Sequence, residues 1–152
     1  MIKKLLISTI FLGLTAFANP LAVGNDLPAL KIKDQFEKEH TVDANVKTII
    51  FSASKTEGTT IKDFLLSKDK EFLTKNNVVY IADITGMPSL ITKFVAMPKM
   101  KDYPFAVLLI DEANKNLIPV KEDMISIISL NNSKVTDVKY VKTAEELAAS
   151  FK

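Results

Sequence analysis

The chain has 152 residues, 20 of them basic and 18 acidic, and it contains no cysteine. Every basic residue is a lysine, so arginine is absent. Arginine is the usual reader of guanine and the usual bidentate partner of phosphate, so a nearly neutral chain without it is a poor candidate for binding nucleic acid. The missing thiols exclude thiol–disulfide exchange and cysteine-dependent peroxide reduction, because both need a thiolate.

The first 18 residues have the features of an export signal. Lys3 and Lys4 precede an apolar run, Leu5 to Phe17, and Ala16-Phe17-Ala18 supplies the small residues of a cleavage site. An apolar run of about 13 residues is shorter than the roughly 20 needed to span a bilayer. We expect cleavage after Ala18, release without a membrane span or a lipid anchor, and a location in the bacterial periplasm or outside the cell.

The expected product, residues 19–152, has the length of a single domain. It is large enough to form an apolar core without disulfides. Several of its segments have the pattern of β-strands, either paired across short polar turns or as continuous β-branched and aromatic runs that suit strands buried on both faces. Hairpins are expected at 30–33 with 40–42 and at 125–130 with 135–141, and buried strands at 47–52, 78–84 and 105–110.

Helices are expected between the buried strands and at the end of the chain. Capping residues and prolines indicate where each helix begins and ends. The helices are expected at 60–76, with Thr60 as the N-cap; at 88–98, between two prolines; and at 144–151, behind a capping box of Thr143 and Glu146. This alternation of strands and helices predicts an α/β fold.

This order of elements resembles the thioredoxin fold in its peroxiredoxin-like form, which has an extra N-terminal hairpin. Residues 23–42, VGNDLPALKIKDQFEKEHTV, are similar to the VGxxxPxFxLxDxxGKxxxL opening of that group. Against the group's PxxxTxxC motif, Ser52 takes the proline place, Thr56 the threonine place and Thr59 the place of the reactive cysteine. The resemblance implies a thioredoxin-like (peroxiredoxin-type) central sheet with an N-terminal hairpin and flanking helices, without the thiol and arginine of that group.

A narrower resemblance is to the YtfJ-like family of exported bacterial proteins, which have the thioredoxin fold and no established activity. It rests on the signal, on Lys99-Met100-Lys101-Asp102-Tyr103-Pro104 before a strand that ends in Asp111, and on Thr143-Ala144-Glu145-Glu146 after the last hairpin. The similarity covers residues 23–152. It implies an exported, cysteine-less thioredoxin-fold protein.

A segment rich in hydroxyl side chains lies between the first buried strand and the following helix. Free N–H groups at a helix N-terminus can hold an anion, and α/β sheets bind ligands at the carboxyl ends of their strands. The alternative is a capped, solvated loop. The candidate ligand-binding residues are Ser52, Ser54, Lys55, Thr56 and Thr59. Met87, Met97 and Met100, with Tyr103 and Phe105, are either part of an adjacent peptide-binding surface or part of the core.

Catalysis by one of these hydroxyls needs an adjacent base. The only histidine, His40, is expected in the N-terminal hairpin, away from the segment. One histidine and no cysteine exclude the usual zinc and copper sites. Asp34, Asp83 and Asp111 stand near strand ends and could together bind a hard cation, although acids there are more often turn residues. We expect no catalytic residue, no metal and no cofactor.

Three functions are open at this point. The favoured one is an exported, redox-inactive thioredoxin-fold protein that binds a protein or small ligand in the cell envelope. The second is a hydrolase-type or other non-thiol enzyme that uses the Ser52–Thr60 loop. The third is a structural envelope-interaction protein without a pocket.

Overall fold

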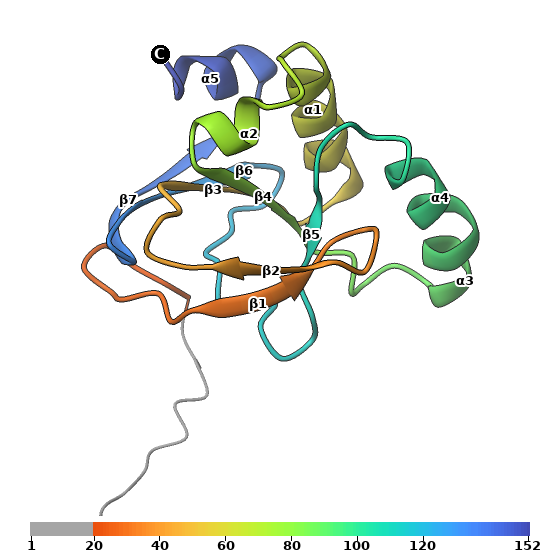
Figure 1. Ribbon diagram of the computed structural model, residues 1–152, viewed down its shortest axis with the longest axis horizontal. Coiled ribbons are helices and arrows are strands. Elements are labelled where there is room, and N and C mark those ends of the chain that lie inside the picture. The colour runs from red at the N-terminus through yellow and green to blue at the C-terminus, as the bar shows by residue number, and fades with distance from the viewer. Residues whose placement is uncertain (1–19) are drawn as a thin grey trace, which may run out of the picture.

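A five-stranded sheet forms the centre of the computed structural model, which describes residues 20–152 (Figure 1). β3 (Thr48–Ser52) is parallel to β4 (Val78–Ala82), which is parallel to β5 (Leu108–Leu109). On the other side of β3, the hairpin of β6 (Ile125–Asn131) and β7 (Lys134–Val141) continues the sheet with antiparallel pairing. The strand order is β5-β4-β3-β6-β7, and the predicted α/β fold is confirmed.

The expected N-terminal hairpin is a separate two-stranded sheet of β1 (Leu30–Lys33) and β2 (Glu39–Val42). A single antiparallel bridge between Asp34 and Leu108 joins it to the edge strand β5. The expected export signal, residues 1–18, lies outside the described residues. Within residues 20–152, no helix combines the length and the apolar character needed to cross a membrane.

Each face of the central sheet has its own apolar core. Ile49 and Phe51 belong to one core and Ile50 to the other, as expected for a strand whose side chains alternate between faces. The first core lies against the hairpin β1–β2. The second lies under the helices α1 (Lys55–Leu66), α2 (Phe72–Lys75) and α5 (Ala144–Ala149).

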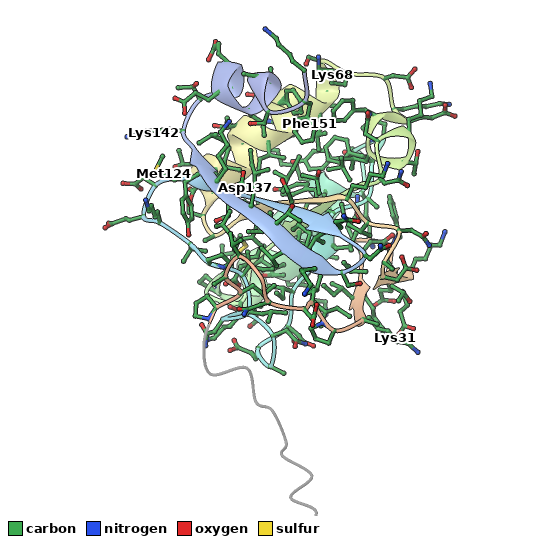
Figure 2. The ribbon with its side chains drawn as sticks, turned by 90° about the vertical axis from the view of Figure 1, so that its left-hand side faces the viewer. Lys31, Lys68, Met124, Asp137, Lys142 and Phe151 are labelled. Atoms are coloured by element: carbon green, nitrogen blue, oxygen red, sulfur yellow. The ribbon has the colours of Figure 1, made fainter. Side chains whose placement is uncertain are left out.

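Three phenylalanines hold the helices of the second core together. Phe64 of α1, Phe72 of α2 and Phe151 at the C-terminus have ring centroids 5.4–6.0 Å apart. Figure 2 shows Phe151 below α5, directed toward α1. Because these residues come from separate parts of the chain, the cluster fixes the closing helix against the middle of the fold.

The helix predicted for 60–76 is two helices, and its predicted start is wrong. α1 begins at Lys55 with the extended residue Ser54 as its N-cap, so Thr60 lies inside the helix rather than at its cap. Glycine and threonine are poor helix formers. The burial of Ile61, Phe64 and Leu65 against the sheet outweighs that local preference.

The prediction that Pro98 limits the next helix is also wrong. The helical segment runs through α3 (Ser89–Ile91), the π-helical turn η1 (Thr92–Ala96) and α4 (Met97–Met100), with Pro98 inside it. A proline lacks the N–H that an α-helix needs, and its ring clashes with the carbonyl four residues earlier. A π turn just before Pro98 changes the hydrogen-bond spacing and accommodates the proline.

At the C-terminal end, the capping box before α5 is confirmed. The backbone N–H of Glu146 donates to the Thr143 hydroxyl at 3.1 Å, and the Glu146 carboxylate accepts from the N–H of Lys142 at 3.3 Å. The helix ends at Ala149, two residues earlier than the predicted Phe151.

Candidate ligand pocket

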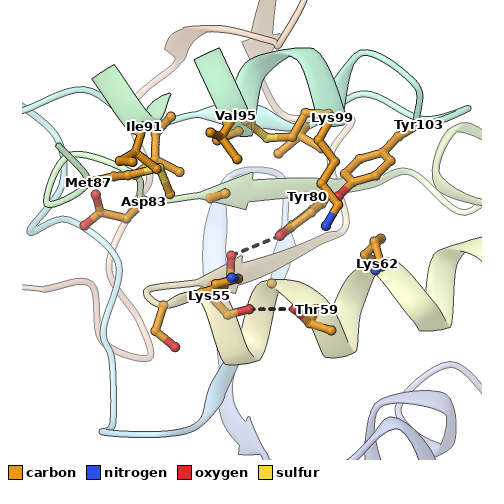
Figure 3. Close-up of a pocket in the computed structure, with 18 residues that line it drawn as sticks. Lys55, Thr59, Lys62, Tyr80, Asp83, Met87, Ile91, Val95, Lys99 and Tyr103 are labelled. Carbon is orange, nitrogen blue, oxygen red and sulfur yellow. Dashed lines mark hydrogen bonds between the residues drawn. The ribbon is translucent and has the colours of Figure 1, made fainter. Parts of the chain in front are cut away.

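A pocket of about 220 Å³ opens at the carboxyl ends of β3 and β4 (Figure 3). Such an edge is where α/β folds commonly bind ligands. In Figure 3, α1 forms one wall and the helical segment of α3, η1 and α4 forms the opposite wall. The residues that follow β4, beginning with Asp83, close one end.

Four of the five predicted ligand-binding residues line this pocket: Ser52, Ser54, Lys55 and Thr59. The fifth, Thr56, is exposed on α1 and is not part of the lining. The difference follows from the early start of α1, because a helix directs successive side chains about 100° apart and Lys55 and Thr59 share a face that Thr56 does not.

The floor of the pocket is polar and buried. The hydroxyls of Ser52 and Tyr80 are hydrogen-bonded at 3.0 Å, and both residues are buried. Burial raises the pKa of Tyr80 to about 12, against the opposing effect of its hydrogen bond with Ser52. The phenol is therefore protonated at neutral pH and can donate a hydrogen bond. Gly58 of α1 lies beside this floor: a Cβ built at that position would be 3.5 Å from the Tyr80 oxygen, which is an ordinary van der Waals contact.

The hydroxyl of Thr59 is already hydrogen-bonded within its own helix. Thr59 Oγ1 donates to the carbonyl of Lys55 at 3.0 Å, one turn earlier in α1. By contrast, the side chain of the N-cap Ser54 makes no capping hydrogen bond. The mouth of the pocket at the start of α1 therefore offers the Ser54 hydroxyl and the positive end of the helix dipole.

Positive charge surrounds the pocket. Lys55 and Lys62 extend from α1, and Lys99 extends from α4 (Figure 3). Lys62 lies 3.3 Å from Asp63, whereas the other two lysines form no ion pair with any residue of the described range. The one acid in the lining, Asp83, accepts from the N–H and hydroxyl of Thr85 at 2.9 and 2.6 Å and so stabilises its own turn.

The wall opposite α1 is apolar. Ile91 and Val95 line the pocket, although 46% and 56% of their surfaces are exposed. Leu90 and Phe94, beside them on the same helical segment, are 69% and 65% exposed. Large apolar side chains clustered in this way on a surface mark a binding site more often than scattered single ones do.

Of the five residues considered for a peptide-binding surface, Met87, Met100 and Tyr103 line the pocket. Met97 and Phe105 pack with the core under the helices. Met100 and Tyr103 also pack with that core, so the core alternative holds for four of the five residues, and a peptide-binding surface stays a prediction.

Sequence reasoning missed the residue that positions the pocket wall. Gln35 is 0% exposed; its Nε2 donates to the carbonyls of Met100 and Phe105 at 3.1 and 2.8 Å, and its Oε1 accepts from the N–H of Val107 at 2.8 Å. It thus ties the hairpin turn to the segment that carries Met100, Tyr103 and Val107. A lone glutamine in a polar turn gives no signal of this role.

His40 is in β2, as predicted, and its Nε2 lies 2.6 Å from the buried carboxylate of Asp34. That carboxylate also accepts from the N–H groups of Phe36 and Lys38. Burial alone would raise the pKa of Asp34, but the hydrogen bonds from His40 and these N–H groups outweigh it and hold the pKa below its usual value. His40 therefore stabilises the hairpin turn.

The three aspartates considered for a cation are used separately. Asp34 and Asp83 hold their own turns, and Asp111 accepts from the backbone and side-chain nitrogens of Asn114 at 2.9 Å. Among residues 20–152, no three histidine or acidic side chains are grouped closely enough to hold a metal ion.

No protein-family model and no curated protein matches this chain. Solved structures do match it. A thio-disulfide isomerase from Thermus thermophilus is 16% identical, with a TM-score of 0.51 over 86% of this chain and 94% of that one. A peroxiredoxin-like protein from Aquifex aeolicus is 17% identical, with a TM-score of 0.52 over 86% of each chain. The thioredoxin domain of a thiol-disulfide oxidoreductase from Bacteroides vulgatus is 15% identical, with a TM-score of 0.51 over 86% and 98%.

These similarities establish the fold: the chain has a thioredoxin-like α/β fold, similar to structures of both thiol-disulfide and peroxiredoxin-like proteins. Because its sequence contains no cysteine, it lacks the thiolate on which thiol–disulfide and peroxidase chemistry depends. The fold and the absent thiol fit a redox-inactive thioredoxin-like protein.

Proposed function

We propose that this chain is an exported, redox-inactive thioredoxin-fold protein that binds a protein or small ligand in the cell envelope, through the pocket beside Ser52–Thr59. The narrower membership of the YtfJ-like family is part of this proposal. The observation that carries it is the pocket itself, which gathers Ser52, Ser54, Lys55 and Thr59 at the edge of the sheet where ligands bind.

Two features favour binding over hydroxyl catalysis at this site. The Ser52 hydroxyl is buried and paired with the protonated phenol of Tyr80, which is a poor base at neutral pH. The only histidine of the chain is held by Asp34 in the hairpin. An interaction protein without a pocket would have no cavity beside Thr59, and the pocket lining includes that residue.

Site-specific crosslinking tests the binding proposal. A photoreactive amino acid replaces Thr56, which is exposed beside the pocket mouth but outside the lining, in one variant and the exposed Lys139 of β7 in a control. We expect a species from the envelope fraction to crosslink at position 56 and not at position 139. Identical products at both positions, or none at position 56, would contradict the proposal.

The export part is tested separately. Cells expressing the full chain are fractionated, and the N-terminus of the recovered protein is read by mass spectrometry. We expect the chain in the envelope or medium to begin at Asn19. Recovery of a chain that still begins at Met1 from the cell interior would show that the export proposal is wrong.

A further inference from the structure

We infer that the ligand of this pocket is a small apolar carboxylate: a carboxylate group joined to a short hydrocarbon chain or a single aromatic ring. This inference rests on the proposed binding function and specifies the ligand. It follows from three independent properties of the pocket, namely its size, its apolar wall and its charge.

The size of the pocket limits the ligand. An apolar cavity of about 150 Å³ holds one benzene molecule, whereas pockets for drug-sized ligands measure about 300–1,000 Å³. At about 220 Å³, the pocket has room for one ring or a short acyl chain. A second hollow, more polar and about 560 Å³, adjoins the mouth past Ser54 and Lys55, so a longer chain end would meet a polar surface there.

The wall of α3, η1 and α4 requires an apolar partner. Ile91 and Val95 line the pocket while about half of each side chain is exposed, so a ligand body in the pocket would remove this surface from water. Met87 and Met100 complete the wall, and their flexible side chains can adjust to either a ring or a chain. A π-helical turn within the wall, Thr92–Ala96, is a feature frequently found at functional sites.

The charge of the pocket selects an anion. Three lysines face one aspartate in the lining, and that aspartate is occupied by Thr85. In Figure 3, the amino group of Lys99 points from the α4 side toward Tyr80, and Lys55 and Lys62 lie across the pocket on α1. A carboxylate between these walls would accept hydrogen bonds from lysine amino groups, which are the stronger, charge-assisted kind.

One buried acid, Glu57, is near Tyr80 but is not part of the pocket lining. Glu57 is 4% exposed, and its Oε2 has no hydrogen-bond partner among the described residues. It lies near enough to Tyr80 for its charge to raise the pKa of that phenol. We place the ligand carboxylate between Lys55 and Lys99, the two lysines of the lining that form no ion pair among the described residues, and its apolar body along Ile91 and Val95.

A carboxylate fits this site better than a phosphate. Phosphate groups are usually held by an arginine fork or by a glycine-rich loop of backbone N–H groups. The chain has no arginine, and Gly58, the one glycine of the lining, is inside α1. Lysine amino groups together with hydroxyl donors are sufficient to bind a carboxylate, which carries a single negative charge.

Calorimetry and amide NMR shifts on the full-length protein test the ligand class, with octanoate as the probe. Octylamine has the same chain with the opposite charge, and acetate has the same charge without the chain. We expect saturable octanoate binding with shifts centred on the pocket, and no comparable binding of the other two. Equal binding of octylamine would overturn the charge selection, and equal binding of acetate would overturn the apolar requirement.

Paired variants locate the two ends of the ligand. Changing both Lys55 and Lys99 to Gln should weaken octanoate binding at least tenfold, since a hydrogen bond to a charged group is worth a factor of about ten or more. Lys139→Gln on β7 is the charge control. Val95→Asp should abolish binding, whereas Leu90→Asp, on the same helical segment but outside the lining, should leave it within about twofold.

The test separates this inference from the proposed function. If octanoate does not bind but position 56 still crosslinks an envelope component, the ligand class is wrong and the proposed function stands. If octanoate binds and the double lysine variant binds it equally well, the assignment of the carboxylate to Lys55 and Lys99 is wrong. Loss of both octanoate binding and crosslinking would overturn both.

Discussion

Replacing Gln35 with methionine removes three hydrogen bonds while keeping a side chain of similar length and volume. The amide of Gln35 bonds the carbonyls of Met100 and Phe105 and the N–H of Val107, and all four residues are buried. The variant therefore leaves two carbonyls and one N–H without their partner, and the methionine sulfur is only a weak acceptor.

The loss can be estimated from the number of groups affected. Each hydrogen bond contributes about 1 kcal/mol net, and a buried group left unpaired costs about 1–3 kcal/mol. Three such groups give a loss of about 3–9 kcal/mol, a large part of the roughly 5–15 kcal/mol that stabilises an ordinary domain. For a domain of this size we expect a decrease in Tm of at least about 10 °C.

Urea unfolding followed by circular dichroism measures this loss, with the slope of the transition checked for two-state behaviour. Phe36→Ala, in the same turn, is the control: the side chain is 51% exposed, and its loss should change stability by about 0.5 kcal/mol or less. Because Gln35 positions the segment with Met100 and Tyr103, Gln35→Met should also weaken ligand binding. A loss no larger than that of Phe36→Ala would refute the assigned role of the glutamine.

Three further substitutions test separate parts of the fold. Because the pKa of Asp34 in the folded protein lies below its ordinary 3.8, the unfolded chain binds the proton more tightly. The stability that this carboxylate contributes should therefore be present above about pH 4 and lost as the pH falls further. Urea midpoints measured between about pH 6 and about pH 2.5 should fall less in Asp34→Asn than in the unsubstituted protein. Gly58→Ala should stabilise the protein by up to about 1 kcal/mol, because its methyl group meets the Tyr80 oxygen at an ordinary contact of 3.5 Å; a clear decrease in Tm would show that the pocket floor is tighter than this distance indicates. Thr143→Ala should lower the free energy of unfolding measured in urea by about 1 kcal/mol, because it removes the acceptor for the Glu146 N–H. An unchanged urea midpoint would mean that the cap contributes nothing to stability.

The order of the elements could be predicted because each depends on local patterning. Continuous apolar runs predicted β3 and β4, and the Thr143–Glu146 pair predicted the start of α5. Helix boundaries were less accurate. Thr60 has the chemistry of an N-cap, but the chain is already helical five residues earlier, since packing against the sheet outweighs local preference.

Part of the candidate site could be predicted because it depends on local patterning. Ser52, Ser54, Lys55 and Thr59 were identifiable because a strand end followed by a helix start places them at the edge of the sheet. Lys99 and Val95 belong to a distant segment that reaches the pocket only when α3, η1 and α4 fold across it. No local pattern distinguishes such residues from an ordinary solvated lysine or core valine.

By itself, the sequence determined the class of fold and excluded thiol chemistry, because residue identity and the period of apolar side chains are properties of the chain alone. Only the tertiary structure decided that Gln35 is buried, that His40 is paired with Asp34 and that three lysines and an exposed apolar wall border one pocket. Burial and charge at a site depend on which distant segments meet there, and those contacts form only when the chain packs.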